Sequence, residues 1–557
     1  MSKEPAAETT PDDLPDDTLG WRVAVLELAP PVAASLTFIA GLVLLASAAQ
    51  PALPDRLNAL LQAWPLAAAE LSHFLASIAG VLLLIVADGL RRRLDGAYWL
   101  TLGLLGAGAL FSLLKALDYE EAIILTLIAL LLIPARRAFY RRSQLTGALF
   151  SGPWLIGVAL ALALVTGLLL IAYHDVAYRD ELWWTVLRDQ DLSRSLRALA
   201  GAVVVGVLVL VRSALRPHRK SPSGDKAAAD LARAEAILAR AEGARGEANL
   251  IFTGDKRFVF SPSGQSFLMF RPRGNLWIGM GDPVGPAADR LDALLAFHAA
   301  ADAACASPAL YSASAALLPQ LIELGYAVRK IGEVAHIDAA RFSMDGPARA
   351  RLRQTWNRFK RDGWRIEVVP PGGAVDWPAL KSISDEWLAA HGGHEKCFSL
   401  GRFDPDYLTH FPIAIAGKDG EPPAAFSSLW PSADKGEIGI DLMRHRSGTP
   451  SGLMDILFIG LIEWASAEGY RIVDLGMTPL AGISRARYAP SMNKIGAAIY
   501  EHGEDLYGFK GLRSYKSKFA PDWQPVFIGA PGYVSLPIAL AQAAILTSGG
   551  LKGLFAK

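Results

Sequence analysis

The chain has few cysteines and lacks the nucleotide-binding and nucleophile motifs of several common enzyme classes. Only Cys305 and Cys397 occur in 557 residues, so there is no disulfide framework, which fits a reducing compartment. No GxxxxGK[ST] loop, no GxGxxG after a strand and no GxSxG elbow is present. These absences remove the usual support for nucleotide hydrolysis, dinucleotide redox chemistry and α/β-hydrolase chemistry.

Charge is scarce and nearly balanced, whereas apolar residues are abundant. Charged residues make up 20% of the chain and hydrophobic residues 52%, and the formal net charge is +1. A chain with so little net charge has no overall basicity for nucleic acid, so any such partner must be held by a local basic patch. The apolar excess is too large for an ordinary soluble enzyme, so it must be concentrated in one part of the chain.

The apolar residues gather in the first part of the chain, in six runs. The runs are Val32 to Ala49, Leu71 to Leu90, Ala97 to Leu117, Ala122 to Ala135, Trp154 to Tyr173 and Leu196 to Val211. A membrane-spanning helix needs about 20 apolar residues, and most of the runs come close to this length. Arginines follow the second, fourth and sixth runs, so the positive-inside rule places both termini in the cytoplasm. We therefore expect a disordered tail over residues 1–20 and an α-helical transmembrane domain of six helices over residues 21–215.

The second part of the chain is more polar and begins after a linker that contains Pro and Ser, over residues 216–226. Short alternating runs and longer helical runs follow one another between Gly and Pro turns, which is typical of an α+β fold. Two consecutive α+β units are predicted, over residues 227–365 and 366–532. The tail over residues 533–557 is expected to form an amphipathic helix against the membrane or against protein.

The segment from Glu437 to Phe519 is expected to carry the functional site. Its pattern indicates a strand over Glu437 to Arg444, a helix over Met454 to Glu468 and a strand over Tyr470 to Leu475. Side chains at the ends of such strands converge on a cleft, which would bring Asp441 near the cations that follow Tyr507. The alternative is a soluble α/β core whose charges only face water.

Two other segments carry candidate binding groups. Cations surround Trp356 and Phe359, which suits RNA or a lipid headgroup surface, although a solvated helix face is the alternative. The candidate tRNA-binding residues in this segment are Arg351, Arg353, Arg358, Lys360 and Arg361. The second segment contains His391, His394 and Cys397, but without a second ligand pair no metal site is predicted.

Six short segments of the polar half form a recognisable series. They are Gly254-Asp255-Lys256-Arg257, Met280-Gly281-Asp282-Pro283-Val284-Gly285, Glu395-Lys396-Cys397-Phe398-Ser399-Leu400-Gly401, Asp441-Leu442-Met443-Arg444, Leu475-Gly476-Met477-Thr478-Pro479-Leu480 and Gly511-Leu512-Arg513-Ser514-Tyr515-Lys516-Ser517-Lys518-Phe519. In content and order they resemble the phosphatidylglycerol lysyltransferase family, the MprF-type aminoacyl-phosphatidylglycerol synthases. The resemblance covers essentially the whole polar half, whereas the apolar half is similar only in having several spans.

The resemblance implies a tandem acetyltransferase-like (GNAT) fold for the cytosolic half and a place in the bacterial inner membrane. It implies transfer of a lysyl, alanyl or arginyl group from aminoacyl-tRNA to the glycerol hydroxyl of phosphatidylglycerol, without a cofactor. This reaction would lower the negative charge of the membrane and protect against cationic antimicrobial peptides. Full-length family members carry many more spans, of which the first portion is a flippase, so the resemblance supports synthase activity and leaves flipping open. The partners considered are aminoacyl-tRNA, phosphatidylglycerol, the lipid bilayer and a second copy of the chain.

The residues of the polar half suit this chemistry. An ester donor is already activated, so it needs no ATP site, in agreement with the missing P-loop. The α-ammonium of the donor needs a fixed carboxylate, for which Asp441 is the first candidate and Glu395 the second. Arg444 and Lys516 are expected beside the oxyanion and the leaving oxygen. The other substrate-binding candidates are Lys396, Ser399, Met477, Lys510, Arg513, Tyr515 and Lys518.

Two alternatives remain open from the sequence. One is an acyltransferase of the same fold that uses another donor, such as acyl-CoA, or another acceptor lipid, although the turn at Ser447 to Gly452 lacks the expected glycine-rich pattern. The other is a membrane sensor or transporter without enzymatic activity. The sequence does not identify the group that removes the proton from the acceptor hydroxyl.

Overall fold

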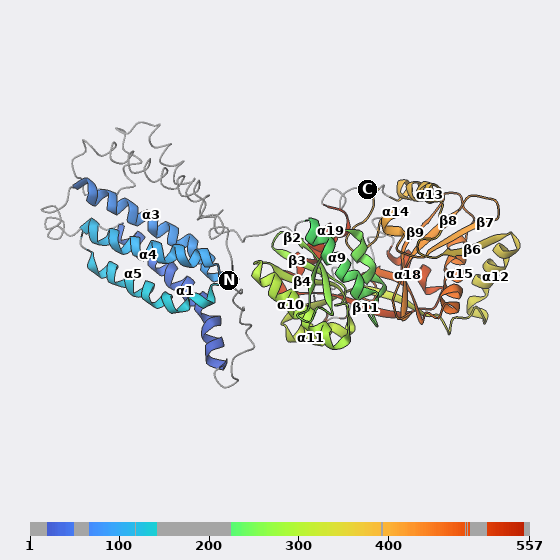
Figure 1. The fold of residues 1–557 in the computed structure, drawn as a ribbon, viewed down its shortest axis with the longest axis horizontal. Helices are drawn as coiled ribbons and strands as arrows, with labels where there is room; N and C mark the ends of the chain where they lie inside the picture. The colour runs from blue at the N-terminus through green and yellow to red at the C-terminus, as the bar shows by residue number, and fades with distance from the viewer. Residues whose placement is uncertain are drawn as a thin grey trace, which may run out of the picture. The chain divides into compact units, whose positions relative to one another are not determined.

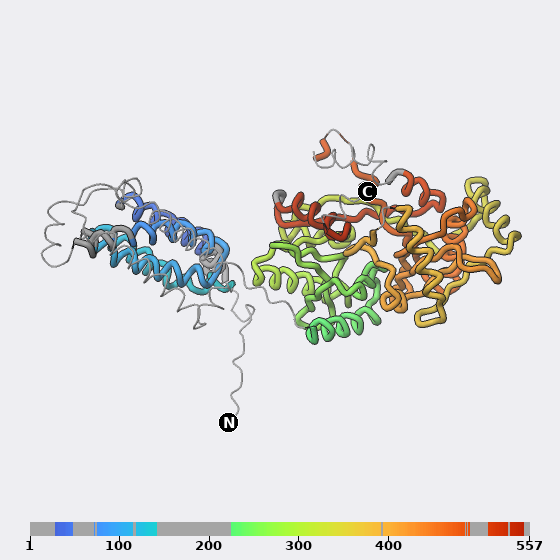
Figure 2. The backbone as a smooth tube through the Cα atoms, turned by 90° about the horizontal axis from the view of Figure 1, so that it is seen from above, coloured from blue at the N-terminus to red at the C-terminus, as the bar shows by residue number. Residues whose placement is uncertain are grey.

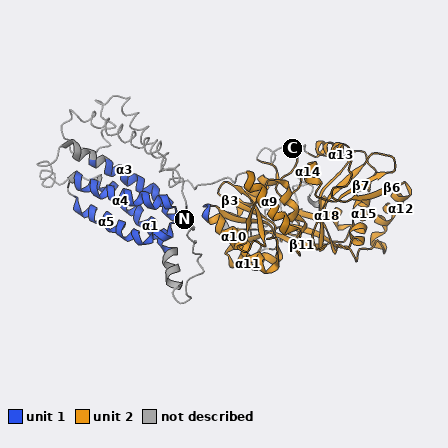
Figure 3. Ribbon diagram, viewed as in Figure 1, with its two compact units in different colours: residues 1–220, 303–305 blue, residues 221–302, 306–557 orange. Residues whose placement is uncertain are grey.

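The computed structural model describes residues 19–48, 66–116, 118–141, 224–391, 394–484, 486, 488–490 and 509–550. The chain divides into two compact units, one over residues 1–220 with 303–305 and one over residues 221–302 with 306–557 (Figure 3). The fifth and sixth predicted membrane runs and the predicted disordered tail lie almost entirely outside the described residues.

Four helices of the first unit coincide with the first four apolar runs. They are α1 (Leu19–Ala48), α3 (Leu66–Arg91), α4 (Asp95–Ala116) and α5 (Tyr119–Leu132), the last continued by the 3-10 helix η3 (Ile133–Ala138). Successive helices of this series pack side by side (Figure 1). Gly41 of α1 and Gly80 of α3 allow the close approach, because a Cβ atom on Gly41 would lie 2.8 Å from the Gly80 carbonyl oxygen.

The outer faces of these helices are as apolar as their contacts. Leu83 and Leu125 are fully buried between helices, whereas Leu127 and Leu131 on α5 are 59% and 60% exposed. By length and composition, two stretches of the described residues could cross a membrane, Leu28–Ser47 and Asp95–Leu114. Apolar side chains on both faces are typical of helices in lipid. The six-helix transmembrane domain itself stays a prediction.

The second unit is built on one mixed sheet. Its strands are β1 (Arg257–Phe260), β2 (Phe267–Arg273), β3 (Leu276–Met280), β4 (Ser307–Ser314), β5 (Tyr326–Asp338), β6 (Trp364–Val369), β7 (Ile413–Lys418), β8 (Ala425–Pro431), β9 (Glu437–His445), β10 (Ile472–Pro479) and β11 (Asp522–Pro531). They lie in the order β1-β2-β3-β4-β11-β5-β10-β9-β8-β7-β6. The helices are α9 (Gly224–Leu238), α10 (Arg290–Ala303), α11 (Leu318–Glu323), α12 (Ala350–Arg361), α13 (Trp377–Ala390), α14 (Pro405–Leu408), α15 (Leu453–Ala467), α18 (Phe509–Ser517) and α19 (Gly532–Thr547), with 3-10 turns such as η4 (Gly246–Thr253). The α+β character predicted for this part is confirmed.

The sheet contains the same arrangement twice. A parallel strand pair joined by a helix occurs as β3–α10–β4 and again as β9–α15–β10. Each pair is followed by a helix and an antiparallel strand, α11–β5 and α18–β11. The two final strands are exchanged, because β11 lies between β4 and β5 while β5 also pairs with β10. The exchange joins the two halves into one continuous sheet.

Helix α12 was predicted to expose both its cations and its aromatic residues, but the aromatic residues are buried. Trp356 and Phe359 are 8% and 2% exposed and pack with Leu352 into the core around α15, since these three positions lie on one helix face. The aromatics therefore do not interleave with the cations on the surface. Because α12 packs against α15 and β6, it associates with the second half of the sheet, ahead of the predicted boundary at residue 365. The division into two subdomains stays a prediction.

The C-terminal helix is shorter than the predicted one. Helix α19 covers Gly532–Thr547, and residues 551–557 lie outside the described part. Its buried face consists of Leu536, Ala539, Ala543 and Leu546. These residues belong to the hydrophobic cluster that also contains Ile278 of β3 and Ile528 of β11. Figure 2 shows this helix, in red, beside the green strands of the first half. The tail was predicted to lie against the membrane or against protein, and the buried face of α19 lies against protein.

Candidate functional site

The parallel strands β9 and β10 separate at their carboxyl ends. Hydrogen-bonded pairing between them covers only three residue pairs and ends at Asp474 and Gly439, although both strands continue. Each strand also carries an irregularity just beyond that point, β9 opposite Ser428 and β10 between Asp474 and Met477. Ligands of α/β sheets bind at the carboxyl ends of parallel strands, and bulges are common beside active sites. This opening is the candidate site.

The irregularity in β9 brings Asp441 and Arg444 to one face of the sheet. Residues three apart on a regular strand point to opposite faces. Here Ser428 of β8 stands opposite both Asp441 and Leu442, so the alternation shifts by one residue. Leu442 consequently packs into the hydrophobic cluster that includes Leu380 of α13 and Phe426 of β8, whereas Ile440 and Met443 face the core around α15. Both candidate residues thus lie on the face that the loop after α13 covers.

Asp441 is held by three donors in a partly buried position. Its Oδ1 accepts from the Gly401 backbone N–H at 2.8 Å, and its Oδ2 accepts from the Tyr407 hydroxyl at 2.9 Å and the Ser428 hydroxyl at 3.2 Å. The Trp430 indole N–H donates to the same Tyr407 oxygen at 2.9 Å. Burial raises the pKa of the Asp441 carboxyl from 3.8 to about 6, against the lowering effect of the three hydrogen bonds. At neutral pH this side chain is a buried negative charge.

Arg444 is occupied by Glu395. Its two terminal nitrogens meet the two carboxylate oxygens of Glu395 at 2.9 and 2.6 Å, and one of them also donates to Ser384. The Arg444 side chain is only 4% exposed, and its guanidinium lies 5.5 Å from the centre of the Trp387 ring. The geometry gives Arg444 the role of a positioning residue for Glu395. The predicted contact with an oxyanion stays a prediction.

The segment Glu395–Gly401, which we call the site loop, connects both groups to the rest of the fold. Glu395 binds Arg444 at its first residue, and Gly401 binds Asp441 at its last. Between them Phe398 is fully buried, with a left-handed backbone (φ 63°) and its ring 6.0 Å from that of Tyr311. A non-glycine residue held in this conformation needs strong support from its surroundings. The loop is therefore fixed in place beside the site.

Lys516 lies on the other side of the opening. Its Nζ donates to the carbonyl oxygens of Gly476 at 2.9 Å and Met477 at 3.3 Å, at the irregularity in β10. The residue is 5% exposed, and burial lowers the pKa of its amine from 10.5 to about 8, while Asp474 opposes the shift. A lysine with this pKa can exchange a proton near neutral pH. A lysine needs a lowered pKa to accept a proton at neutral pH, and the sequence could not show whether any lysine has one. Lys516 has such a lowered pKa.

The other predicted substrate groups have varied surroundings. Lys396 lies in the site loop and burial lowers the pKa of its amine, whereas the Ser399 hydroxyl lies 3.1 Å from that of Thr547. Arg513 pairs with Glu333 and Lys518 pairs with Asp455 at 3.1 Å. Tyr515 packs against Phe458 and Phe519 in the core around α15. The side chain of Lys510 lies outside the described part. Among the candidates whose side chains are described, Lys516 and Met477 meet at the strand opening.

Some basic side chains of α12 bind backbone carbonyl groups, and most of them are exposed to solvent. The Arg353 and Arg358 side chains donate to the carbonyl oxygens of Met344 and Ser451. Lys360 lies over the Trp356 ring at 4.4 Å, while Arg351, Arg358, Lys360 and Arg361 are all exposed. This helix therefore presents a row of cations to solvent, without the exposed aromatics that were expected.

Sequence reasoning missed the residues that hold the two carboxylates. Tyr407, Ser428 and Trp430 surround Asp441, and Ser384 contacts Arg444. They come from α14, β8 and α13, and no spacing in the chain relates them to β9. Asp404, whose side chain accepts from the Asp406 N–H at 3.2 Å and caps α14, was the one local signal for the short helix that contains Tyr407.

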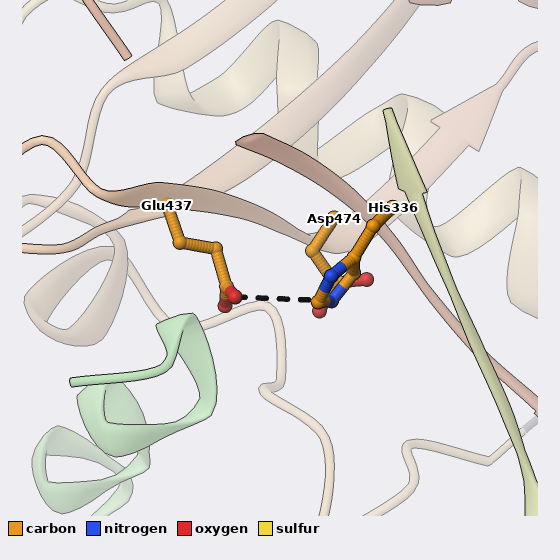
Figure 4. Close-up of side chains that lie close together, drawn as sticks. All are labelled: His336, Glu437 and Asp474. Carbon is orange, nitrogen blue, oxygen red and sulfur yellow. Dashed lines mark ion pairs between the residues drawn. The ribbon is translucent and has the colours of Figure 1, made fainter. Parts of the chain in front are cut away.

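One group of described residues has the composition of a cation site. His336, Glu437 and Asp474 each place a ligand atom within 4.8 Å of the others (Figure 4). His336 Nε2 lies 3.8 Å from Glu437 Oε2. Glu437 also accepts from the Gly246 N–H at 2.7 Å, and Asp474 from the Gly476 N–H at 2.7 Å. Glu437 therefore already has a structural role in joining η4 to β9, whereas Asp474 stabilises the irregularity of its own strand β10.

Comparison with known proteins assigns the family. A family model described as phosphatidylglycerol lysyltransferase, C-terminal, matches residues 235–529. Phosphatidylglycerol lysyltransferase from Bacillus subtilis is 32% identical over 515 residues, which cover 91% of this chain and 58% of that protein. The protein of the same name from Staphylococcus xylosus is 28% identical over 426 residues, covering 75% and 48%. The chain thus spans about half the length of the curated relatives it matches.

Solved structures agree with this assignment. The C-terminal domain of a putative lysylphosphatidylglycerol synthetase from Agrobacterium fabrum is 39% identical, with a TM-score of 0.52, over 59% of this chain and 99% of that one. L-PGS from Bacillus licheniformis is 32% identical, with a TM-score of 0.51, over 59% and 98%. The second unit therefore has the large-sheet, acetyltransferase-like fold of these domains. The chain belongs to the phosphatidylglycerol lysyltransferase family, as its six sequence segments predicted.

Proposed function

We propose that this protein transfers an aminoacyl group from aminoacyl-tRNA to the glycerol hydroxyl of phosphatidylglycerol. Family membership supports the lipid acceptor and, through the names of the relatives, a lysyl group ahead of alanyl or arginyl. The observation that carries the proposal is that a partly buried carboxylate with a raised pKa and a buried amine with a lowered pKa come from strands and helices that meet at one strand opening.

Asp441 suits the α-ammonium of the aminoacyl donor. A carboxylate has about four acceptor sites, and three hydrogen bonds occupy Asp441, so one site remains for a ligand. Because the carboxylate is buried, an ammonium that reaches it meets little competition from water. Fixing the ammonium also fixes the neighbouring ester carbonyl, which is the reacting group.

Lys516 suits removal of the proton from the acceptor hydroxyl. In its neutral form the Nζ takes the hydroxyl proton while the glycerol oxygen forms a bond to the ester carbonyl carbon. The tetrahedral intermediate then collapses, the bond to the tRNA ribose oxygen breaks, and that oxygen takes up a proton. A pKa near 8 gives Lys516 both protonation states around neutral pH, so it can also return the proton to the leaving oxygen.

The location and biological role belong to the same proposal. Both termini would lie in the cytoplasm and the reaction would occur at the inner face of the bacterial inner membrane. The exposed cations of α12 are the proposed contact for tRNA phosphates. Lipids that carry an aminoacyl group have less negative charge, so the product would lower membrane affinity for cationic antimicrobial peptides.

The direct test uses the full chain in phosphatidylglycerol vesicles with radiolabelled Lys-tRNA, Ala-tRNA or Arg-tRNA. Labelled lipid is expected with at least one donor, and lysyl transfer is expected to be fastest. If none of the three yields labelled lipid, the proposed function is wrong. Label transfer from acyl-CoA in the same vesicles would instead favour the alternative acyltransferase.

A further inference from the structure

Helix α19 has no charged residue on any face. Its 16 residues include no Asp, Glu, Lys or Arg, although only one side packs on the sheet. On the outer side Ile538 is 54% exposed, and Pro537, Ala541 and Ala544 are exposed as well. A surface helix of a soluble domain normally carries charged residues on its outward face. The outer face of α19 is instead uncharged, with Ile538 as its large exposed apolar side chain.

The other exposed apolar residues of this unit lie in different surroundings. Leu291 and Leu295 are 43% and 42% exposed on α10, a helix that also carries Arg290 and Asp292. Ile322 is 66% exposed on α11, next to Glu323. Single apolar residues among charged neighbours are ordinary on protein surfaces. Among the described helices of this unit with more than ten residues, α19 alone has an outer face without charge.

The C-terminal end of α19 contacts the site loop. The Cys397 backbone N–H donates to the Thr547 carbonyl at 2.9 Å, and the hydroxyls of Ser399 and Thr547 lie 3.1 Å apart. The same loop binds Arg444 through Glu395 and Asp441 through Gly401. The uncharged helix thus ends beside the candidate site, so whatever covers the helix lies close to the opening between β9 and β10.

We propose that the outer face of α19 rests on the lipid bilayer and turns the candidate site toward the lipid headgroups. The proposal deepens the proposed function, on which it rests for a lipid acceptor. The residues that follow the helix support a bilayer, because Leu551, Leu554 and Phe555 are interspersed with Lys552 and Lys557. Apolar residues mixed with lysines suit an anionic lipid surface, where each lysine adds attraction and each apolar side chain inserts.

The consequence concerns how the acceptor reaches the site. A phosphatidylglycerol molecule would present its glycerol hydroxyl to Lys516 without leaving the bilayer, because the helix holds the site at the membrane surface. Damage to the outer face of α19 would then impair reaction with lipid in a bilayer. It would not impair reaction with a short-chain phosphatidylglycerol that is dissolved as single molecules.

The first test locates the helix with a fluorescent probe. In the full chain, with Cys305→Ser and Cys397→Ser, the single variants I538C and I322C are labelled with an environment-sensitive dye. The protein is reconstituted in nanodiscs of phosphatidylglycerol and phosphatidylcholine. We expect a blue shift and at least about twofold quenching by lipids with nitroxide on the acyl chain for residue 538, and neither for residue 322. An unquenched probe at residue 538 would overturn the proposal, and so would shielding that depends on protein concentration, which indicates a second copy.

The second test compares two forms of the acceptor. Variants I538E and I322E each place one carboxylate on an exposed position, so both are expected to keep the wild-type melting temperature. For I538E, transfer to phosphatidylglycerol in vesicles should fall at least about fivefold, with unchanged transfer to short-chain phosphatidylglycerol below its micelle concentration. I322E should match wild type on both acceptors. Equal rates for I538E and wild type in vesicles would refute the membrane contact. Loss of transfer by wild type on both acceptors would refute only the proposed function, because the probe experiment does not depend on activity.

Discussion

Replacing Asp441 by Asn tests the charge at the candidate site with almost no change in shape. The amide oxygen can still accept from the Gly401 N–H, and the Tyr407 and Ser428 hydroxyls can rotate so that their oxygens accept from the new NH2 group. What is lost is the negative charge proposed to hold the donor ammonium. Breaking a buried, hydrogen-bonded charge pair costs about 3–5 kcal/mol, so transfer should fall roughly 100-fold to 5,000-fold.

Stability should change in the opposite direction. Folding raises the pKa of Asp441 from 3.8 to about 6, so the folded protein holds this proton more tightly between those values. The carboxyl therefore favours folding at low pH, and its contribution of about 3 kcal/mol is lost as pH rises through about 6. A neutral amide has no such loss. At pH 7.5 the melting temperature of D441N should equal or exceed that of wild type.

The assay combines initial rates of labelled lipid formation in vesicles with thermal unfolding at pH 5 and pH 7.5. Asp455→Asn is the matched control, because that carboxylate is also mostly buried, with 13% of its side chain exposed, and pairs with Lys518, just after α18. D455N should transfer within about threefold of wild type, since the Lys518 side chain is 45% exposed and ion pairs with an exposed partner contribute little. A D441N variant that melts normally and keeps more than a tenth of the wild-type rate would refute the role assigned to this carboxylate.

Three further outcomes follow from the same contacts. Lys516→Met should reduce transfer at least about 100-fold. It should also raise the melting temperature at pH 7, because folding lowers the pKa of this buried amine from 10.5 to about 8, so the amine destabilises the fold below pH 8 and this penalty fades only as pH rises toward 10.5. The wild-type rate should rise with pH up to about 8, and a flat profile between pH 6.5 and 8.5 would contradict this. Glu395→Gln leaves the charge of the buried Arg444 without its partner and should lower the free energy of unfolding by about 3–5 kcal/mol. The double variant E395Q/R444M removes both charges and should recover part of that free energy. A double variant less stable than E395Q would disprove the pairing. Tyr407→Phe removes the hydroxyl between Asp441 and Trp430, so the Asp441 carboxylate should be misplaced and the transfer rate should fall about tenfold. We expect kcat to fall more than KM rises. An unchanged kcat would exclude a positioning role for Tyr407.

The local elements of the site were predictable, because each has a clear hydrophobic period. The expected strand from Glu437 to Arg444 is β9, one residue longer at its end, and the expected helix from Met454 to Glu468 is α15 shifted by one residue. Their periods persist because both elements pack into the same apolar core. The expected strand from Tyr470 is β10, which starts two residues later and runs on to Pro479.

The contacts between distant segments were not predictable. Arg444 pairs with Glu395 across 49 residues, and this depends on the irregularity in β9 that turns Arg444 to the face of Asp441. An extra residue opposite Ser428 has no recognisable pattern in the sequence, so a regular strand would have placed the two side chains on opposite faces. The same holds for Arg513, whose partner Glu333 belongs to the other half of the sheet.

The exchange of strands has a consequence for biosynthesis. Strand β4 receives its neighbour β11 only after the ribosome has made residues 522–531, more than 200 residues after β4 itself. Until then the nascent chain exposes the unpaired edges of β4 and β5, and such edges invite aggregation. A gene truncated before the codon for Asp522 should therefore yield an insoluble second unit and not a folded first repeat.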